Sequence, residues 1–287
     1  MTGDALDSTE LTFAPRKVEG GSYRFDVGAI KGSAGSVSLL FQALLLPLVF
    51  ATTASRLTLI GGTHVPWSPT VHYLTDVFLS ALGRIGVEAG LTLRRWGWYP
   101  AGGGEVEGTI LPCRGLSPIQ LGTGTPLASI RGLSAVSRLP RSIAERQRQR
   151  ALDRLATAGL SADIALEEDT TARGPGTLVF LAAPGRAGFS ALGRRGYPAE
   201  RVADEAVDLL LAYQQSGAAV DDHLANQLVP FLALAREPSA FTCPTLTPHL
   251  RTVAWVVQQF LPVQIALDDG PPARVQISQP GAPGAAS

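Results

Sequence analysis

The amino-acid sequence predicts an α+β protein, and three observations support this class. Apolar residues make up 45% of the 287 residues, which is enough for a sizeable core. In the first part of the chain, segments with the periods of strands and helices follow one another as strand, helix, strand, strand. Near Leu127 this pattern starts again, which indicates a second α/β block.

The elements of the first block follow from periodicity and turn residues. They are short strands at 11–13 and 23–27, a helix at 36–50, a strand at 56–60, a helix at 71–85, and strands at 91–95 and 105–110. The first two strands flank the Gly20–Gly21 turn. Leu74, Val77 and Phe78 are expected on one apolar face of the second helix.

The second block and the C-terminal part have the same mixed pattern. The expected elements are a strand at 130–137, a helix at 142–158, strands at 164–168 and 177–182, and helices at 199–216, 222–235 and 248–260. The second block can form a small domain inserted into the first. The end of the chain, 271–287, is rich in Pro, Gly and Ala, and we expect it to be a disordered tail.

Charge and cysteine content narrow the function classes. The 24 basic and 24 acidic residues balance, which argues against a general polyanion binder but leaves room for a local nucleic-acid groove. Cys113 and Cys243 are the two cysteines and lack metal-like spacing, so a cytoplasmic location is expected. The polar segment 1–10 does not resemble a signal peptide, and the apolar segment 39–51 is too short to cross a membrane.

His249 is the first candidate for chemistry. Thr247 and Pro248 precede it and are a favoured helix cap and first helical residue, so His249 is expected in the first turn of a helix. The positive end of the helix dipole disfavours the imidazolium ion and attracts phosphate. A neutral imidazole can then act as a nucleophile beside a phosphate. The alternative interpretation is a surface or capping histidine.

The second candidate is the polar run from Asp221 to Gln227. If it opens a helix, His223, Asn226 and Gln227 share one face of that helix. Such a patch can hydrogen-bond a base, a ribose or a metal-bound water. The alternative is a solvated helix face beside a capping aspartate.

Three further segments have two interpretations each. The glycines of 97–106 can cradle phosphate or make a tight turn, and we favour the turn because the spacing is not that of a Walker loop. Trp67, in the loop 61–69, can stack a base or hold the loop against the core. The seven arginines from Arg131 to Arg154 can face RNA or lie on a solvated helix face.

Taken together, these segments resemble the RNA 3′-terminal phosphate cyclase family. The run Gly-Trp-Tyr-Pro-Ala-Gly-Gly-Gly-Glu-Val is similar to the glycine-rich signature of that family. The other similar segments, in the family's order, are 32–37, 61–69, 223–227 and 247–262. The resemblance extends over about residues 5–265.

The resemblance implies a fold. Repeated βαβαββ units form a large catalytic domain, here 1–125 and 218–270, and a smaller α/β domain is inserted at 126–217. Most of the first N-terminal repeat is expected to be missing, because no segment before Asp7 corresponds to the Gly-rich opening of the family.

The resemblance also implies an activity in RNA processing. An ATP-dependent ligase closes an RNA 3′-terminal phosphate into a 2′,3′-cyclic phosphodiester, assisted by Mg²⁺ or Mn²⁺. His249 takes the position of the histidine that attacks ATP and becomes adenylylated, after which AMP passes to the RNA phosphate. The positions that match the ATP contacts of the family are Gln42, His223, Leu224, Ala225, Asn226 and Gln227. Neither metal ligands nor an oligomeric state follow from the sequence, and the expected partner is RNA with a 3′-terminal phosphate.

Departures from the family pattern leave two alternatives open. Asn226 and His72 stand where aspartate is usual or frequent, and Val253 replaces an asparagine. The alternatives are a non-catalytic cyclase-like protein in RNA processing or ribosome assembly, and an inactive truncated fragment. The presence of His249 favours the active enzyme, because the non-catalytic relatives lack the nucleophilic histidine.

Overall fold

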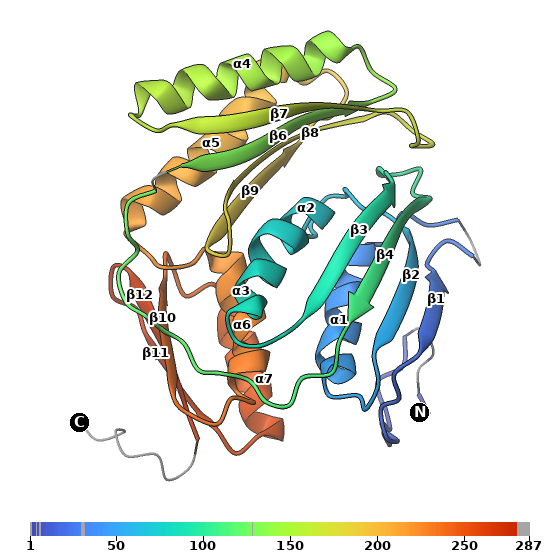
Figure 1. The fold of residues 1–287 in the computed structure, drawn as a ribbon, viewed down its shortest axis with the longest axis vertical. Helices are drawn as coiled ribbons and strands as arrows, with labels where there is room; N and C mark the ends of the chain where they lie inside the picture. The colour runs from blue at the N-terminus through green and yellow to red at the C-terminus, as the bar shows by residue number, and fades with distance from the viewer. Residues whose placement is uncertain (1, 4, 6, 30–31, 128, 280–287) are drawn as a thin grey trace.

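The computed structural model describes residues 2–279 apart from 4, 6, 30, 31 and 128. This part of the chain contains three four-stranded mixed sheets with helices packed against them, so the α+β class is confirmed. Figure 1 shows one sheet across the top of the molecule and the other two on either side below it. No helix in the described part is long and apolar enough to span a bilayer.

The first sheet packs against helix α1 (Val37–Val49) (Figure 1). Its strands, in order across the sheet, are β1 (Ser22–Asp26), β2 (Ser55–Gly61), β4 (Gly104–Ile110) and β3 (Ala89–Arg95). β1 and β2 are parallel, and the other pairs are antiparallel. Helix α1 begins where the Ser36 hydroxyl accepts a hydrogen bond from the Leu39 N–H (3.2 Å), and it buries Phe41 and Leu45.

The helix predicted at 71–85 is present with a change of winding. Its three parts are α2 (Val71–Tyr73), η1 (Leu74–Leu79), which is π-helical, and α3 (Ser80–Gly83). The predicted apolar face is confirmed, because Leu74, Val77 and Phe78 are buried. A π-helical turn inside a helix often marks a functional site. This one directly follows Tyr73, which lines the cavity described below.

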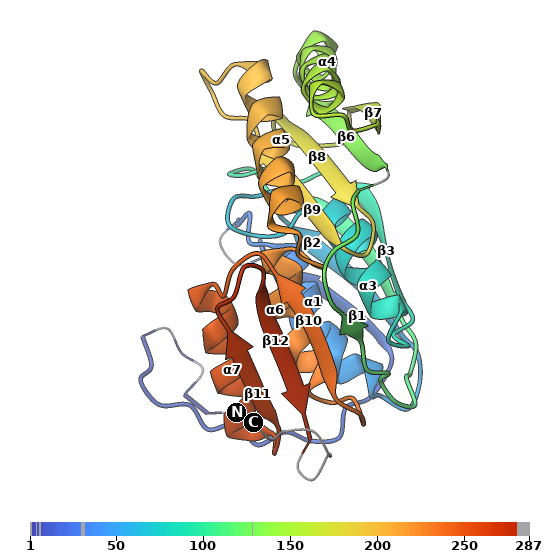
Figure 2. The same ribbon diagram turned by 90° about the vertical axis from the view of Figure 1, so that its left-hand side faces the viewer.

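The second sheet packs against helices α6 (Asp222–Leu232) and α7 (Pro248–Phe260), as Figure 2 shows. Its strands, in order, are β11 (Gln264–Asp268), β12 (Ala273–Ser278), β10 (Ser239–Cys243) and β5 (Gln120–Leu121). We expected a disordered tail at 271–287, but residues 273–278 form β12 in the interior of this sheet. Alternate residues of β12 are buried, and this period of two outweighs the Pro and Gly content nearby. Residues 280–287 lie outside the described part.

The third sheet has helices on one face and the main core on the other (Figure 1). Its strands, in order, are β7 (Ala162–Asp169), β6 (Ile130–Ser137), β8 (Gly176–Ala183) and β9 (Ala187–Leu192), and its helices are α4 (Arg141–Thr157) and α5 (Ala199–Ser216). With these helices the sheet forms an apolar cluster of its own, from Leu127 to Ala218. Its opposite face, which includes Leu133 and Phe180, belongs to the larger cluster.

Periodicity missed β5, β9, β10 and β11, besides β12. These strands are short, and β10 is buried throughout, so it has no alternation of apolar and polar residues. In contrast, the strand expected at 11–13 is absent: Leu11 and Phe13 are exposed, and only Thr12 makes an isolated bridge, with Thr2. A segment of three residues cannot form a strand without a neighbouring strand to pair with.

Two histidines pack where the first sheet meets the third. His64 Nε2 lies 3.0 Å from His72 Nδ1, and His64 Nδ1 lies 2.7 Å from the Thr63 hydroxyl. The His64 ring stacks on Trp96, with 4.2 Å between the ring centroids. Burial lowers the pKa of His64 well below its usual value, and the neighbouring His72 lowers it further. Burial lowers the pKa of His72 to about 4.

We predict that acid weakens folding through these histidines. The folded pKa values of both histidines lie below the unfolded value of about 6.5. Their contribution to the free energy of unfolding is therefore complete above that pH and is lost as the pH falls toward 4. For His72 alone, the free energy of unfolding should fall by about 2 kcal/mol between about pH 7.5 and pH 5. Urea denaturation at both pH values measures this loss. In His72→Asn the loss should be smaller, and an equal loss in both proteins would contradict the prediction.

Candidate active site

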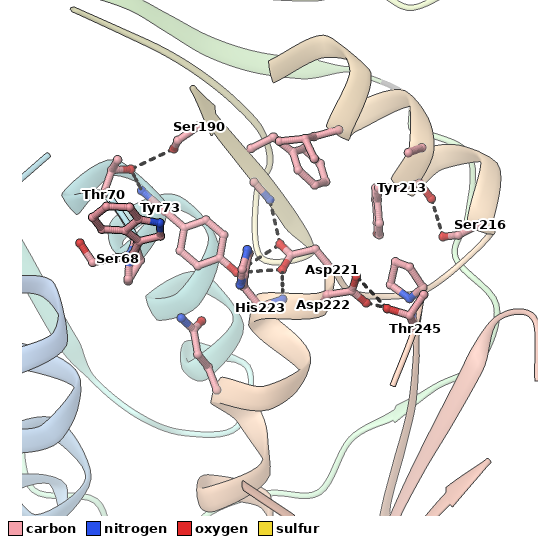
Figure 3. A pocket seen from close by; sticks show the side chains of 18 residues that line it. Ser68, Thr70, Tyr73, Ser190, Tyr213, Ser216, Asp221, Asp222, His223 and Thr245 are labelled. Carbon is pink, nitrogen blue, oxygen red and sulfur yellow. Dashed lines mark hydrogen bonds between the residues drawn. The ribbon is translucent and has the colours of Figure 1, made fainter. Parts of the chain in front are cut away.

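A cavity of about 700 Å³ opens between helix α5, strand β9 and the start of helix α6 (Figure 3). Its lining residues come from five segments, within 67–73, 188–190, 209–216, 221–227 and 244–245. Aromatic side chains and a few polar groups converge on it, which is typical of small-molecule sites of this volume. The segments are far apart in the sequence, so their relative positions depend on tertiary contacts.

The buried carboxylate of Asp221 holds three of these segments together (Figure 3). Its two oxygens lie 3.0 and 3.1 Å from the Tyr73 hydroxyl, which donates from α2. The Gly188 N–H donates from β9 (2.9 Å), and the His223 and Leu224 N–H groups donate from α6 (2.8 Å each). Burial raises the pKa of Asp221, and the backbone donors oppose this by favouring the charged form. A buried carboxylate is costly without such partners, so the contacts depend on one another.

The next carboxylate, Asp222, connects the start of α6 to the segment that enters α7. It accepts hydrogen bonds from the Thr245 N–H (2.9 Å) and the Thr245 hydroxyl (3.2 Å) (Figure 3). Two residues later, the Thr247 hydroxyl caps α7 by accepting from the Leu250 N–H (3.1 Å). The N-terminal ends of α6 and α7 are therefore joined through one short contact. The end of α6 is occupied by the Asp221 carboxylate, whereas α7 is capped by a neutral hydroxyl, so α7 offers the helix end that can attract phosphate.

The predicted position of His249 in the first turn of a helix is confirmed. Pro248 is the first residue of α7, and the His249 side chain that follows it is exposed. His249 does not line the cavity, but it follows Thr245, which does, by four residues. Its imidazole is therefore accessible from solvent.

The predicted nucleotide-binding run is divided between the cavity and the core. His223 and Gln227 line the cavity from one face of α6. Leu224 and Ala225 are buried in the core. The Asn226 side chain donates to the backbone carbonyl four residues earlier (3.2 Å). Two of the five residues are therefore positioned to contact a ligand in the cavity through their side chains.

Gln42 is the predicted nucleotide-binding residue that lies apart from this run. It is on α1, partly buried, and does not line the cavity, so its contact with the nucleotide stays a prediction. Sequence reasoning in turn missed Tyr73 and Phe189, which do line it. Tyr73 and Asp221 are 148 positions apart, and no pattern in the sequence joins them.

Gln227 has an unmet hydrogen-bonding capacity. Its Oε1 atom is buried, and among the described residues no donor reaches it. A buried acceptor without a donor lowers stability by roughly 1–3 kcal/mol. If the Gln227 amide turned toward the cavity, an N–H or O–H group of a ligand would remove this cost.

The structure distinguishes between the paired interpretations of two segments. Gly102 and Gly103 have φ values of 57° and 70°, and the Gly102 N–H donates to the Trp98 carbonyl (2.7 Å), so the glycine motif contains a tight turn. The side chain of Trp67 is 97% exposed and therefore does not hold its loop against the core.

The arginines of α4 are largely neutralised by helix α5. Three of the five arginines of α4 form ion pairs across the two helices. The pairs are Arg146 with Glu200, Arg150 with Asp204, and Arg154 with Asp204 and Asp208. This arrangement favours the solvated helix face over an RNA-binding surface on α4.

The structure therefore defines an α+β protein with a cavity of a size typical for small-molecule ligands. A family model described as RNA 3′-terminal phosphate cyclase matches residues 1–267. The chain belongs to the RNA 3′-terminal phosphate cyclase family, and the family predicted from the sequence motifs is confirmed.

Similar proteins named RNA 3′-terminal phosphate cyclase occur in bacteria and archaea. The one from Methylococcus capsulatus is 46% identical over 267 residues, which cover 90% of this chain and 73% of that protein. The one from Nostoc punctiforme is 42% identical over 276 residues, covering 94% and 79%. The one from Methanopyrus kandleri is 39% identical over 290 residues, covering 97% and 81%.

We predict that Tyr73→Phe lowers the free energy of unfolding by about 1.5–3 kcal/mol, because it removes a buried hydrogen bond to a carboxylate. The matched control is Tyr197→Phe, which removes a less buried hydrogen bond, to the carboxylate of Glu205. The control should lose less than about 1 kcal/mol, because water replaces the lost partner. Urea denaturation of both variants measures the difference. Equal losses in the free energy of unfolding would show that burial does not make the Tyr73–Asp221 contact more stabilising than the control contact.

Proposed function

We propose that the chain converts an RNA 3′-terminal phosphate to a 2′,3′-cyclic phosphodiester, using ATP. The observation that carries the proposal is the position of His249, exposed in the first turn of α7 and four residues beyond the cavity wall at Thr245. Family membership supports it, since the curated relatives that carry this name match 90% or more of the chain.

In the proposed reaction, a ring nitrogen of His249 attacks the α-phosphorus of ATP. An N–P bond forms and pyrophosphate leaves. AMP then passes to an oxygen of the RNA 3′-phosphate, which frees the histidine. The neighbouring 2′-hydroxyl loses its proton, attacks the 3′-phosphorus and displaces AMP. Two activation steps are needed because a phosphate is a poor electrophile until it carries a leaving group.

The cavity fits the nucleoside part of ATP. Its volume of about 700 Å³ lies in the usual range for such ligands. An amino group of the base or a hydroxyl of the ribose would supply the donor that Gln227 Oε1 lacks. The N-terminal end of α7, which has no acidic residue in its first turn, would attract the phosphates. The other positions in the proposed set of nucleotide contacts are Gln42, His223, Leu224, Ala225 and Asn226.

A divalent cation, Mg²⁺ or Mn²⁺, belongs to the proposal as a neutraliser of phosphate charge. The described residues contain no group of three or more His, Cys, Asp or Glu side chains that could hold a metal ion. They therefore do not form a resident metal site, and a cation would be held chiefly by the phosphate oxygens. We assign no metal ligand and no reaction step to it.

The proposal also covers the domain organisation of the chain and its cellular location. We propose that residues 1–125 and 218–270 form a catalytic domain of repeated βαβαββ units, with 126–217 as an inserted domain. The separate apolar cluster from Leu127 to Ala218 supports this division. We propose a cytoplasmic location, supported by two cysteines that are both free.

We predict that His249→Ala lowers the rate of RNA cyclisation by at least about 10³-fold, because the nucleophile is removed. The substrates are ATP and an oligoribonucleotide with a 3′-phosphate, and the product is measured by its resistance to phosphatase. Gln259→Ala, an exposed change at the other end of α7, should leave the rate unchanged. Cyclisation by folded His249→Ala at the wild-type rate would refute the assignment of the nucleophile.

We predict that Gln227→Leu raises the KM for ATP by about 5- to 30-fold without lowering stability. Leucine removes the buried oxygen that lacks a donor, so the free protein becomes more stable. The bound ligand loses a hydrogen-bond partner at the same time. Gln214→Leu is the matched control, because its Oε1 is also buried without a described donor but Gln214 does not line the cavity. A similar KM change in both variants would contradict a direct contact between Gln227 and ATP.

A further inference from the structure

Trp67 has the highest exposed fraction of the large apolar side chains in the described part of the chain, at 97%. Both faces of its indole ring are therefore open to water. Exposure of so large an apolar surface is unfavourable in the free protein. Bases stack on exposed aromatic rings of this kind in proteins that bind single-stranded nucleic acids.

The loop that carries Trp67 has little freedom. Trp67 has a φ of 59°, in the left-handed region that bulky residues rarely adopt, and Pro66 precedes it. The Ser68 hydroxyl donates to the Val65 carbonyl (3.2 Å). At the end of the loop, the Thr70 hydroxyl lies 3.2 Å from the Ser190 hydroxyl of β9. A fixed backbone limits the region that the ring can reach, so less entropy is lost when a base stacks on it.

Trp67 also lies at the cavity, as one of its lining residues. The inner wall is formed by buried or partly buried residues, such as Tyr73, Asp221 and Gln227, whereas Trp67 is almost fully in solvent. A cavity of about 700 Å³ holds one nucleotide but not a polynucleotide. An RNA whose terminus reaches the site must therefore extend past the solvent side, where Trp67 is.

We propose that Trp67 stacks on a base near the 3′ end of the RNA substrate and positions that end at the site. This inference rests on the proposed function. It assigns to Trp67 a role in RNA binding, and none in the reaction of His249 with ATP.

The experiment measures binding of a 5′-fluorescent oligoribonucleotide with a 3′-phosphate by fluorescence anisotropy. Trp67→Ala should raise the Kd by about 5- to 150-fold, the range expected for loss of one base–aromatic stack. Trp67→Phe keeps an aromatic face and should recover most of the affinity. Trp255→Ala removes an exposed tryptophan from α7, away from the cavity lining, and should bind as the wild type does.

An RNA with abasic sites at its last two positions tests stacking itself. It should bind the wild type as weakly as intact RNA binds Trp67→Ala, and the variant should not lose further affinity for it. Equal affinity of folded wild type and Trp67→Ala for intact RNA would overturn the inference, as would wild type that binds no RNA.

Self-adenylylation with α-labelled ATP separates this inference from the proposed function. Trp67 also lines the cavity proposed for ATP, so the two losses are compared with ATP at saturation. Trp67→Ala should then lose far less in the rate of adduct formation than in RNA affinity, because its ring is proposed to contact RNA. A loss of rate as large as the loss of RNA affinity, rescued by Trp67→Phe, would overturn the inference in favour of stacking on the adenine of ATP. No adduct on wild type would refute the proposed function, while the binding measurement would still decide the role of Trp67.

Discussion

The geometry of the site depends on the buried carboxylate of Asp221. Its partners come from α2, β9 and the start of α6, so one side chain connects the helix after the Trp67 loop, the third sheet and the polar run at the start of α6. Breaking any one contact would leave a charge less well paired in a buried place, which is unfavourable. The walls of the cavity are thus fixed relative to one another although their residues are far apart in the sequence. The Asp222–Thr245 contact extends the same connection to α7.

Local chemistry made part of this structure predictable. The sequence Thr247-Pro248-His249 contains a cap and a preferred first residue, and α7 begins there as expected. Long-range contacts could not be predicted in this way. Nothing in the sequence signals that Tyr73 reaches Asp221, or that the expected tail contains a buried strand, because burial of residues 273–278 requires β10 and β11 as neighbours. The family resemblance indicated which segments matter for the site, and the structure showed which side chains of those segments face the cavity.

The arrangement suits a nucleophile that serves two substrates in turn. His249 would receive AMP from a small molecule and pass it to a polymer, so it must be accessible from the cavity and from solvent. An exposed histidine near the cavity wall meets both needs better than one enclosed in the cavity. The N-terminal end of α7, on which it lies, would favour phosphate in either complex. In the proposed reaction the protein's own groups would thereby provide positioning and charge stabilisation, which are the main protein contributions to phosphoryl transfer.

The central claim is that His249 carries AMP, and peptide mapping of the adduct tests it most directly. Trypsin separates the two exposed histidines, because His223 lies in the peptide 202–236 and His249 in the peptide 237–251. Wild-type protein would be incubated with labelled ATP and a divalent cation, digested, and analysed by mass spectrometry. The account predicts AMP on 237–251, released by mild acid. AMP on 202–236, or no adduct on a protein that cyclises RNA, would contradict it.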